Sequence, residues 1–336
     1  MDARLHVSRL SGQATVPPSK SAAHRAVLCA ALADGVSHIT NIEYSQDIRA
    51  TLGAVTQLGA KVAEEPAAVT ITGRGSSGGF VTVTRPVFCN ESGSTLRFMI
   101  PLFSLTAQKV RFTGAGRLFD RPQAVYQMLF DRQGLRFEQT PEGVTVFGRL
   151  RPGGFTLPGD VSSQFITGLL FVLPLLDGDS NLVLTSPLES RGYVDLTLDV
   201  LRTFGIRVEE RADAFHVPGN QRYESRNFTV EADWSQAAFW YAANFAGGQV
   251  DIQGLNMDSE QGDKVIALQY WKLAKPGEAE LDVSQCPDLV PPLAAMAAVR
   301  RGTARLTHAA RLRMKESDRL STVAAALRTM GAQVEE

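Results

Sequence analysis

The sequence predicts a two-domain protein of the α/β (α+β) class, built from a repeated unit of helix, strand, helix and further strands. Its 336 residues exceed the roughly 100–200 residues typical of one domain. Four segments share an amphipathic helical pattern that ends in a glycine and continues into a β-rich stretch; the glycines are Gly59, Gly134, Gly205 and Gly331. Glycine just after a helix is typical of positions with positive φ. We therefore expect each helix to end there.

A further helix and strand precede each of these helices and complete the unit. The first helices of five such units begin near His24, Ser94, Ser162, Ser235 and Pro292. Gly59, Gly134 and Gly205 are spaced by 75 and 71 residues, whereas 126 residues separate Gly205 from Gly331, fewer than two such periods. We therefore expect the unit that begins at Ser235 to lack a strand hairpin near residues 273–280, and the fifth unit to stop incomplete.

The repeats also predict where the domains meet. Three complete units precede the stretch 223–231, so residues 18–228 are expected to form one domain. An opening strand in residues 4–15 is too short to be a unit and is cut off by two prolines, which suit the end of a strand. We assign it to the second domain, residues 1–17 and 229–336, which is expected to be incomplete.

Composition and charge exclude several classes of protein. The 34 Lys and Arg residues balance 35 Asp and Glu residues, so the formal charge is -1 and no basic field for nucleic acid arises. The three cysteines lie far apart, and neither they nor the five histidines show metal-ligand spacing. The N-terminus has no apolar signal segment, and the longest apolar run, residues 165–176, is short. We expect a cytoplasmic protein without a metal, a membrane or a nucleic-acid partner.

Cations stand at the starts of several predicted helices. In residues 17–25, Ser19 or Ser21 can cap a helix, and Lys20 then lies in the first turn, where the helix dipole disfavours a cation. Arg25 follows about a turn later and is expected on the same face. With free helix N–H groups, these residues can bind a phosphate or carboxylate. The alternative interpretation is a solvated lysine beside an ordinary cap.

The second helix start, in residues 90–97, has the same character. Gly93 lets a ligand approach the backbone amides closely, and Arg97 repeats the place of Arg25 in its own unit. These features again suit an anion.

The loop of residues 114–122 carries two arginines, Arg117 and Arg121. It precedes a helix that we expect to begin at Pro122. Taken alone, the loop is equally well interpreted as a plain turn at a helix start.

Polar side chains gather at two further helix starts. The third start offers three hydrogen-bonding side chains where one cap would suffice: Ser162, Ser163 and Gln164. The loop before the next helix supplies a hydroxyl, a guanidinium and a phenol: Ser190, Arg191 and Tyr193. One of the first three is expected to be only a cap, but their convergence suggests a hydroxylated, anionic ligand.

The run of residues 311–319 is the most informative. Lys315 and Arg319 would be i,i+4 neighbours in a helix, a destabilising pair whose cost Glu316 and Asp318 can offset. The alternatives are a solvated charge cluster and an anion clamp with a carboxylate available for proton transfer. Asp288, ahead of an apolar helix, is either an N-cap or a general base. Residues 73–78 match GxGxxG, but they precede a strand-like FVTVT and are interpreted as a hairpin loop.

Taken together, the chain resembles the family of 5-enolpyruvylshikimate-3-phosphate synthases, also called 3-phosphoshikimate 1-carboxyvinyltransferases. The resemblance covers nearly the whole chain and rests, in order, on PPSKSAAHR, NESGSTLRF, GAGRLFDRP, GDVSSQF, ESRGYVDLTL, EADWSQAAF, CPDLVPPLAA and RMKESDRL. It implies a two-domain enolpyruvyl transferase fold of βαβαββ units. The implied reaction moves the enolpyruvyl group of phosphoenolpyruvate to the 5-hydroxyl of shikimate 3-phosphate and releases phosphate, without a cofactor, in a protein expected to be a monomer.

The resemblance also implies roles for individual residues. Shikimate 3-phosphate would be held by Ser21, Arg25, Ser162, Ser163, Gln164, Ser190, Tyr193, Asp288 and Lys315. Phosphoenolpyruvate would be held by Lys20, Gly93, Arg121, Gln164 and Arg319. Asp288 would act as base toward the 5-hydroxyl, Glu316 would take part in protonating the enol carbon, and Lys20 would support the developing charge. Arg97 and Arg191 are further contributors.

Two alternatives follow from departures in the sequence. The family continues past KESDR into a sixth unit that supplies more phosphoenolpyruvate ligands, so this chain is expected to bind weakly and turn over poorly, or to be an inert fragment. The sister enzyme that acts on UDP-N-acetylglucosamine has Lys-Asn where this chain has Lys20-Ser21, and often a cysteine in the loop corresponding to residues 114–121, where none occurs.

Overall fold

The chain folds into two units in this computed structural model, which describes residues 9–75 and 81–336. The larger unit comprises Pro18–Val230 and the short segment Met314–Ser317. The smaller unit comprises Met1–Pro17, Glu231–Arg313 and Asp318–Glu336. No helix among the described residues is both long and apolar enough to cross a membrane, and no cluster of His, Cys, Asp and Glu there is arranged to hold a metal.

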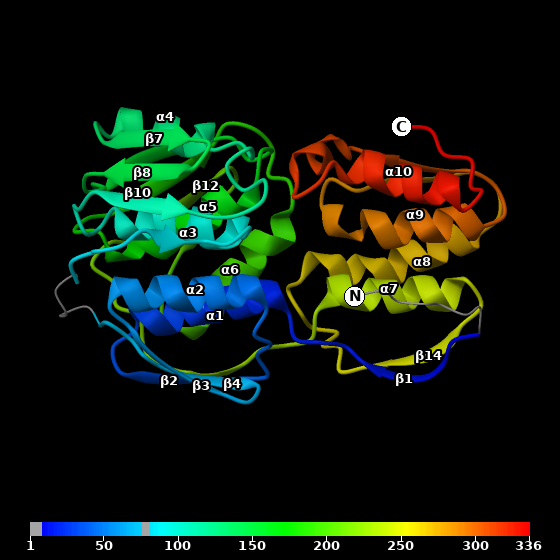
Figure 1. The fold of residues 1–336 in the computed structure, drawn as a ribbon, viewed down its shortest axis with the longest axis horizontal. Helices are drawn as coiled ribbons and strands as arrows, with labels where there is room; N and C mark the ends of the chain where they lie inside the picture. The colour runs from blue at the N-terminus through cyan, green and yellow to red at the C-terminus, as the bar shows by residue number, and fades with distance from the viewer. Residues whose placement is uncertain (1–8, 76–80) are drawn as a thin grey trace. The chain divides into compact units, whose positions relative to one another are not determined.

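The described residues of the larger unit form three copies of one supersecondary unit (Figure 1). The first copy is α1 (Lys20–Leu32), β2 (Val36–Thr40), α2 (Gln46–Leu58), β3 (Lys61–Glu65) and β4 (Ala68–Thr72). The second is α3 (Gly93–Phe103), β6 (Val110–Thr113), α4 (Ala124–Arg132), β7 (Arg136–Thr140) and β8 (Gly143–Phe147). The third is α5 (Ser163–Val172), β10 (Ser180–Leu184), α6 (Arg191–Thr203), β11 (Glu209–Arg211) and β12 (Ala214–Val217), with the short 3-10 helix η1 (Leu173–Leu175) after α5.

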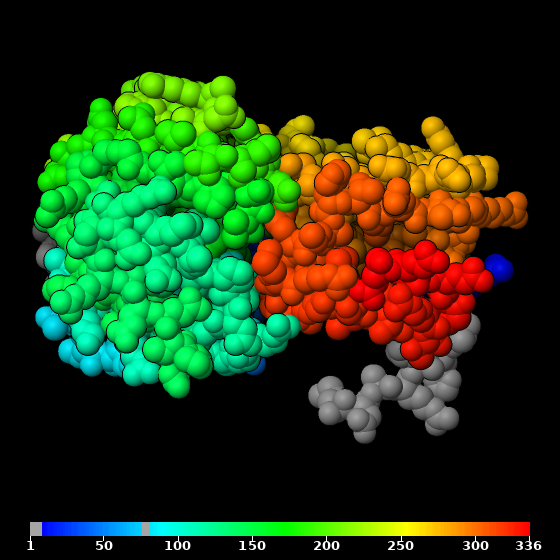
Figure 2. Space-filling model, turned by 90° about the horizontal axis from the view of Figure 1, so that it is seen from above, coloured from blue at the N-terminus to red at the C-terminus, as the bar shows by residue number. Residues whose placement is uncertain are grey.

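Each copy forms a four-stranded sheet with the same topology. One extra parallel strand joins each: β13 (Asn227–Thr229) beside β2, β5 (Val87–Phe88) beside β6, and β9 (Gly153–Leu157) beside β10. The orders are β13-β2-β4-β3, β5-β6-β8-β7 and β9-β10-β12-β11, with the last two strands of each an antiparallel hairpin. The repeated unit predicted from the sequence is thus confirmed. In the space-filling view the second and third copies lie side by side on one face of this unit (Figure 2).

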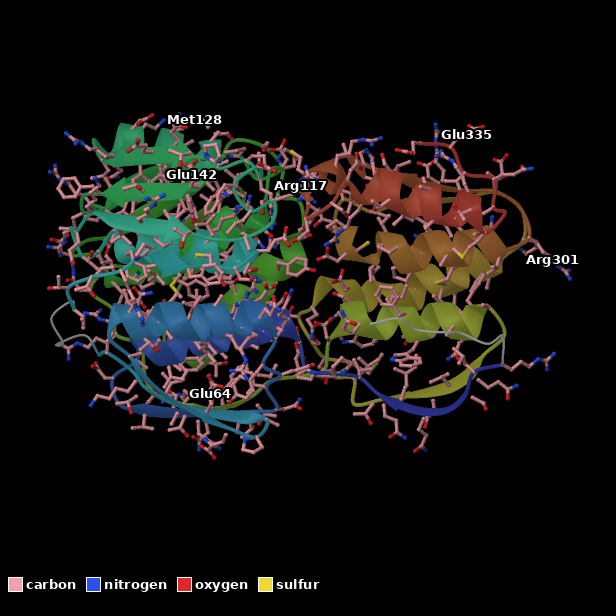
Figure 3. The ribbon with its side chains drawn as sticks, viewed as in Figure 1. Glu64, Arg117, Met128, Glu142, Arg301 and Glu335 are labelled. Atoms are coloured by element: carbon pink, nitrogen blue, oxygen red, sulfur yellow. The ribbon has the colours of Figure 1, made fainter. Side chains whose placement is uncertain are left out.

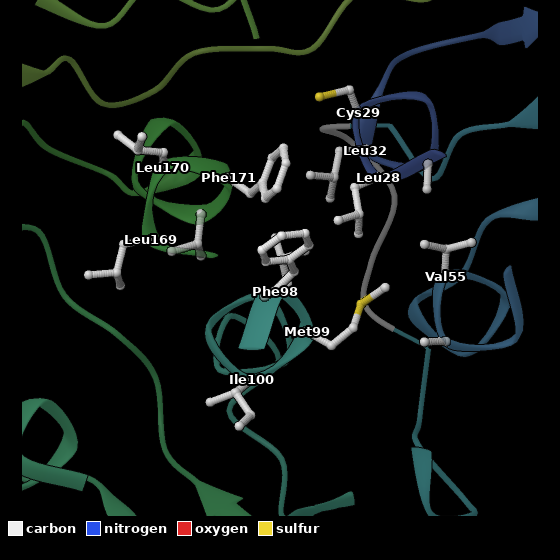
Figure 4. Packing of buried hydrophobic residues seen from close by; sticks show 14 of the residues in the cluster. Leu28, Cys29, Leu32, Val55, Phe98, Met99, Ile100, Leu169, Leu170 and Phe171 are labelled. Carbon is white, nitrogen blue, oxygen red and sulfur yellow. The ribbon is translucent and has the colours of Figure 1, made fainter. Parts of the chain in front are cut away.

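The core of the larger unit is built from the first helix of each copy. Helices α1, α3 and α5 are buried along nearly their whole length because their sequences are apolar on all sides. Phe98 and Phe171 meet edge to face, with ring centroids 5.5 Å apart, and Leu28 and Leu32 pack beside them (Figure 4). Gly168 lets α5 approach α3 closely, since a Cβ there would lie 2.3 Å from the Arg97 carbonyl oxygen.

Local signals set the helix ends as expected. Serine side chains cap the N-termini of α1, α2, α3 and α5 by accepting backbone N–H groups: Ser19, Ser45, Ser92 and Ser162. The four predicted helix-ending glycines have φ of +115°, +69°, +82° and +94° at Gly59, Gly134, Gly205 and Gly331. Their predicted positive φ is confirmed.

The part of the smaller unit that the structure describes, from residue 9 onward, carries two parallel strand pairs and four helices. Strand β1 (Ser11–Thr15) pairs with β14 (Gln249–Gln253), and β15 (Ala279–Asp282) pairs with β16 (Ala304–Thr307). The helices are α7 (Trp234–Phe245), α8 (Ile266–Ala274), α9 (Val290–Val299) and α10 (Arg319–Thr329), with 3-10 helices η2 (Gly262–Val265), η3 (Pro287–Leu289) and η4 (Ala310–Met314). Strand β15 follows α8 after a short turn, so the predicted absence of a hairpin near residues 273–280 is confirmed.

Two local predictions were wrong, and the condition attached to a third is not met. Residues 81–84 form no strand although they alternate in polarity, and the strand that joins this sheet is the shorter β5. Helix α4 begins at Ala124, so Pro122 lies ahead of it in the loop. Lys315 precedes α10, which begins at Arg319 with Asp318 as its N-cap, so Lys315 and Arg319 are not helical neighbours. Part of the GxGxxG match, residues 76–78, lies outside the described residues.

Candidate active site

The first helix start places Lys20 against a carboxylate of the chain itself. Ser19 caps α1 by accepting the Ala22 N–H at 3.3 Å, and Lys20 is the first helical residue. Its Nζ lies 2.8 Å from Oδ2 of Asp47, which stands in the first turn of α2, where a negative charge is favoured. The half-exposed Lys20 therefore has the anionic partner that its position requires.

Arg25 is buried and ties α1 to α6. It is 3% exposed, and its guanidinium donates from Nε to Thr197 Oγ1 at 2.8 Å, from Nη1 to the Ser21 carbonyl at 2.7 Å and from Nη2 to the Tyr193 carbonyl at 2.8 Å. Burial lowers the pKa of Arg25 to about 10. The structure thus brings Ser21, Arg25 and Tyr193 together. The expectation that Lys20 shares a face with Arg25 was wrong, because a five-residue step turns a helix by about 140° beyond a full turn.

Ser190 directly precedes α6 in a left-handed conformation. Its φ of +56° is uncommon for a residue with a side chain, and the residue is buried. Arg191, the next residue, forms ion pairs with Asp195 at 2.8 Å and with Glu210 at 2.5 Å. Ser190 is therefore buried at the start of α6, whereas the side chain of Arg191 next to it pairs with carboxylates at the surface.

Gly93 and Arg121 are in direct contact. Gly93 is the first residue of α3, and a Cβ built on it would lie 2.7 Å from Nη2 of Arg121 and 2.8 Å from Cζ. Arg121 is 5% exposed, and its Nε and Nη1 have no hydrogen-bond partner among the described residues. Nη1 does lie 3.2 Å from Glu316 Oε1, an ion-pair distance without hydrogen-bond geometry, within the larger unit. A buried guanidinium with unused donors at a helix N-terminus is suited to bind an anion.

Arg97 links the loop of residues 114–122 to the N-terminus of α5. Its Nη1 donates to Gln164 Oε1 at 2.7 Å, its Nη2 donates to the Pro122 carbonyl at 3.0 Å, and its guanidinium lies over the Phe165 ring. Gln164 in turn donates to Ser94 Oγ at 3.0 Å. Burial, and then the neighbouring charge of Arg121, lowers the pKa of Arg97 to about 9. Two buried guanidinium groups so placed favour an anion beside them.

The two serines of the third helix start have different roles. Ser162 caps α5 by accepting the Gln164 N–H at 3.4 Å, which confirms the capping interpretation for one of the three side chains. Ser163 is the first helical residue and is buried. Only Gln164 of the three extends its side chain to Arg97.

The remaining predicted site residues are divided between the two units. Lys315 and Glu316 lie in the segment that groups with the larger unit. Asp288 and Arg319 lie in the smaller unit, where Asp288 Oδ1 accepts from Arg319 Nη1 at 2.5 Å. Asp288 stands in η3 and does not cap α9, whose N-terminus has no side-chain cap. The structure therefore pairs the predicted base with a predicted phosphoenolpyruvate ligand.

A buried polar chain lies beneath Lys20 and Asp47. His24 Nδ1 is 2.8 Å from Thr51 Oγ1, which is 2.7 Å from Thr95 Oγ1, and Thr95 donates to Ser92 Oγ at 2.9 Å. Burial, with a smaller contribution from Lys20, lowers the pKa of His24 to about 3, so the imidazole is neutral. The chain joins the N-terminal halves of α1, α2 and α3 and so fixes their register near the site.

The sequence did not reveal the groups that hold the predicted site residues Lys20 and Arg25 in place. Asp47, the partner of Lys20, had only one local signal, an acidic residue in the first turn of a helix, which is ordinary there. Thr197, which accepts from Arg25, lies in the middle of α6 and had none.

Comparisons with known proteins identify the family and the fold of the chain. The family model described as "EPSP synthase (3-phosphoshikimate 1-carboxyvinyltransferase)" matches residues 6–336. The 3-phosphoshikimate 1-carboxyvinyltransferase of Clostridium beijerinckii is 42% identical over 355 residues, covering 98% of this chain and 81% of the relative. The Clostridium acetobutylicum enzyme of the same name is 43% identical over 346 residues, covering 97% and 80%. Among solved structures, EPSP synthase from Acinetobacter baumannii shares the fold, with a TM-score of 0.78 and 24% identity over 96% of this chain and 79% of that one.

Proposed function

Because the chain belongs to the EPSP synthase family, we propose that it transfers the enolpyruvyl group of phosphoenolpyruvate to the 5-hydroxyl of shikimate 3-phosphate and releases inorganic phosphate. The relatives reported above carry the name of this activity, which favours shikimate 3-phosphate over UDP-N-acetylglucosamine as the acceptor. Both proposed substrates are anions, as the buried cations of the larger unit require.

The buried guanidinium of Arg121 is the observation that carries this proposal. Its Nε and Nη1 have no hydrogen-bond partner within residues 9–75 and 81–336, although Nη1 faces the Glu316 carboxylate at 3.2 Å. A buried donor left without an acceptor costs roughly 1–3 kcal/mol. A phosphate or carboxylate group would accept both donors and the N–H groups of the first turn of α3. Arg121 and Gly93, with Gln164 held by Arg97, would therefore hold phosphoenolpyruvate.

The proposed acceptor site lies between α1 and α6. Ser21, Arg25, Ser190 and Tyr193 gather there, because Arg25 bonds both to α1 and to the start of α6. With Ser162, Ser163, Gln164, Asp288 and Lys315, they are proposed to hold shikimate 3-phosphate. The hydroxyl groups suit a hydroxylated ring and the cations its phosphate.

The chemistry is an addition followed by an elimination. The 5-hydroxyl oxygen adds to C2 of phosphoenolpyruvate, its proton passes to Asp288, and C3 gains a proton with the participation of Glu316. The tetrahedral intermediate then loses a proton from C3 and phosphate from C2, which leaves the enol ether. Lys20 would stabilise the charge that develops on the way.

Calorimetry tests the proposal directly. Shikimate 3-phosphate is titrated into the protein by calorimetry. Because the two substrates react when both are present, the Kd of phosphoenolpyruvate is measured as an apparent value, its KM for phosphate release at saturating shikimate 3-phosphate. The Arg121→Gln variant should raise the Kd of phosphoenolpyruvate at least about tenfold, because a charge-assisted bond is lost, and should leave that of shikimate 3-phosphate unchanged. Arg301→Gln is the control, since Arg301 is exposed in the smaller unit (Figure 3). No heat from shikimate 3-phosphate together with no phosphate release would refute the proposal.

The setting of the reaction is also proposed. Cys29, Cys89 and Cys286 are free and buried, which fits the reducing cytoplasm. We propose a monomer there, which sedimentation velocity would test.

A further inference from the structure

We infer that Glu91 is a positioning residue, which sets the Arg121 guanidinium by fastening the loop of residues 114–121. This inference rests on the proposed function, in which Arg121 holds the phosphate of phosphoenolpyruvate. Glu91 lies in the turn between β5 and α3, two residues before Gly93. It acts on Arg121 through the loop backbone.

Two hydrogen bonds join the loop to this turn. Glu91 Oε1 accepts the Arg117 N–H at 2.9 Å, and the Asn90 carbonyl accepts the Ala115 N–H at 2.8 Å. A carboxylate that accepts a backbone N–H forms a stronger bond than a neutral acceptor does. The first half of the loop is thus held by adjacent residues of the turn.

Gly116 packs directly on the Glu91 carboxylate. Its φ is +56°, and a Cβ built there would lie 2.2 Å from Oε1 and 2.4 Å from Cδ of Glu91. A side chain at this position would therefore push the carboxylate away as well as strain the backbone. The loop and the carboxylate form one close-packed contact.

The C-terminal end of the loop of residues 114–121 contacts the start of α3, directly after the turn that contains Glu91. Leu118 is fully buried in the core, and Arg121 lies against Gly93. The loop is therefore fastened at Glu91, at Leu118 and at Gly93. Releasing the Glu91 contact frees the backbone that leads to Arg121, whose guanidinium must be placed to within a fraction of an ångström to bind a phosphate oxygen.

Three single variants test the role of the carboxylate. Glu91→Ala should raise the Kd of phosphoenolpyruvate, measured at saturating shikimate 3-phosphate, by about tenfold, since a charge-assisted bond is lost, and leave the Kd of shikimate 3-phosphate unchanged. Glu91→Gln keeps an oxygen acceptor for the Arg117 N–H and should stay within about threefold of the wild type. Glu64→Ala is the matched control, because the Glu64 carboxylate also accepts a charge-assisted hydrogen bond, from Arg49 Nη1 at 2.8 Å, but lies in β3, in the sheet of the first copy (Figure 3). Equal weakening of both ligands, or no rescue by Gln, would overturn the inference.

A double-mutant cycle tests the contact with Gly116. Gly116→Ala should also weaken phosphoenolpyruvate binding, because the new Cβ collides with Glu91. In the Glu91→Ala background that collision is absent, so adding Gly116→Ala should weaken binding further by less than it does alone. Additive effects of the two changes would contradict a shared contact.

A ligand-free measurement separates this inference from the proposed function. Hydrogen exchange at the Arg117 amide should be at least about tenfold faster in Glu91→Ala than in the wild type and nearly unchanged in Glu91→Gln, because the amide has lost its acceptor. If the wild type binds neither ligand, the proposed function fails, and this readout alone decides whether Glu91 fastens the loop. Unchanged exchange at Arg117 in Glu91→Ala would overturn the inference.

Discussion

Replacing Gly93 with alanine should weaken the binding of phosphoenolpyruvate while leaving the fold intact. The new Cβ would lie 2.7 Å from Arg121 Nη2, whereas ordinary contacts begin at 3.4 Å, so the guanidinium must retreat by about 0.7 Å. A hydrogen bond of about 2.9 Å to a ligand oxygen would then lengthen to about 3.6 Å, which is no longer a hydrogen bond. The loss of one charge-assisted bond, about 1.5–3 kcal/mol, corresponds to a rise in Kd of about 10- to 150-fold.

The free energy of unfolding should change little in this variant. Gly93 does not have a positive φ, so alanine adds no backbone strain, and at a helix position it gains up to about 0.5–1 kcal/mol over glycine. That gain opposes the cost of moving Arg121. Gly53→Ala in α2 is the matched control, because no atom lies within 4 Å of a Cβ at Gly53.

Phosphate release at saturating shikimate 3-phosphate gives the apparent Kd of phosphoenolpyruvate, and urea unfolding in parallel gives the stability. Gly53→Ala should be more stable than the wild type and bind both ligands equally well. A Gly93→Ala protein that binds phosphoenolpyruvate as tightly as the wild type would refute the assigned contact between Gly93 and Arg121. A large loss of stability would refute the claim that the change acts on the site alone.

Three further predictions concern stability and share one measurement, urea unfolding. The pKa of His24 is about 3 in the folded protein and 6.5 in the unfolded chain, so the unfolded chain binds the proton first as the pH is lowered. The free energy of unfolding should therefore decrease by about 1.4 kcal/mol for each unit that the pH falls between about pH 6 and pH 4. His24→Asn should flatten that slope, and an unchanged slope would contradict a buried neutral imidazole. Gly168→Ala should cost about 1–3 kcal/mol or more, because the Cβ meets Tyr126 Oη at 2.2 Å, and a near-neutral effect would contradict the close approach of α3 and α5. Ser45→Ala should cost about 1 kcal/mol by removing the cap of α2, and no loss would count against that cap.

Predictions that depend on neighbours in the chain agreed with the structure. The caps at Ser19 and Ser162 and the positive φ at Gly59 and Gly205 follow from hydrogen bonds and backbone sterics within a few residues. The repeat of helices and strands was visible for the same reason, since each copy carries the same local pattern. The local prediction at Pro122 was wrong: proline fits the first turn of a helix, but here it lies ahead of α4, and its carbonyl accepts from Arg97 Nη2.

The sequence by itself determined the class of fold, most of the helix ends and the kinds of side chain that gather at the helix starts. Only the tertiary structure decided which of those side chains meet. Lys20 pairs with Asp47 from the next helix, and Arg25 bonds Thr197 from a helix two repeats later. The physical reason is that such partners depend on how separately formed units pack, because a side-chain contact across the chain leaves no local backbone preference at either residue.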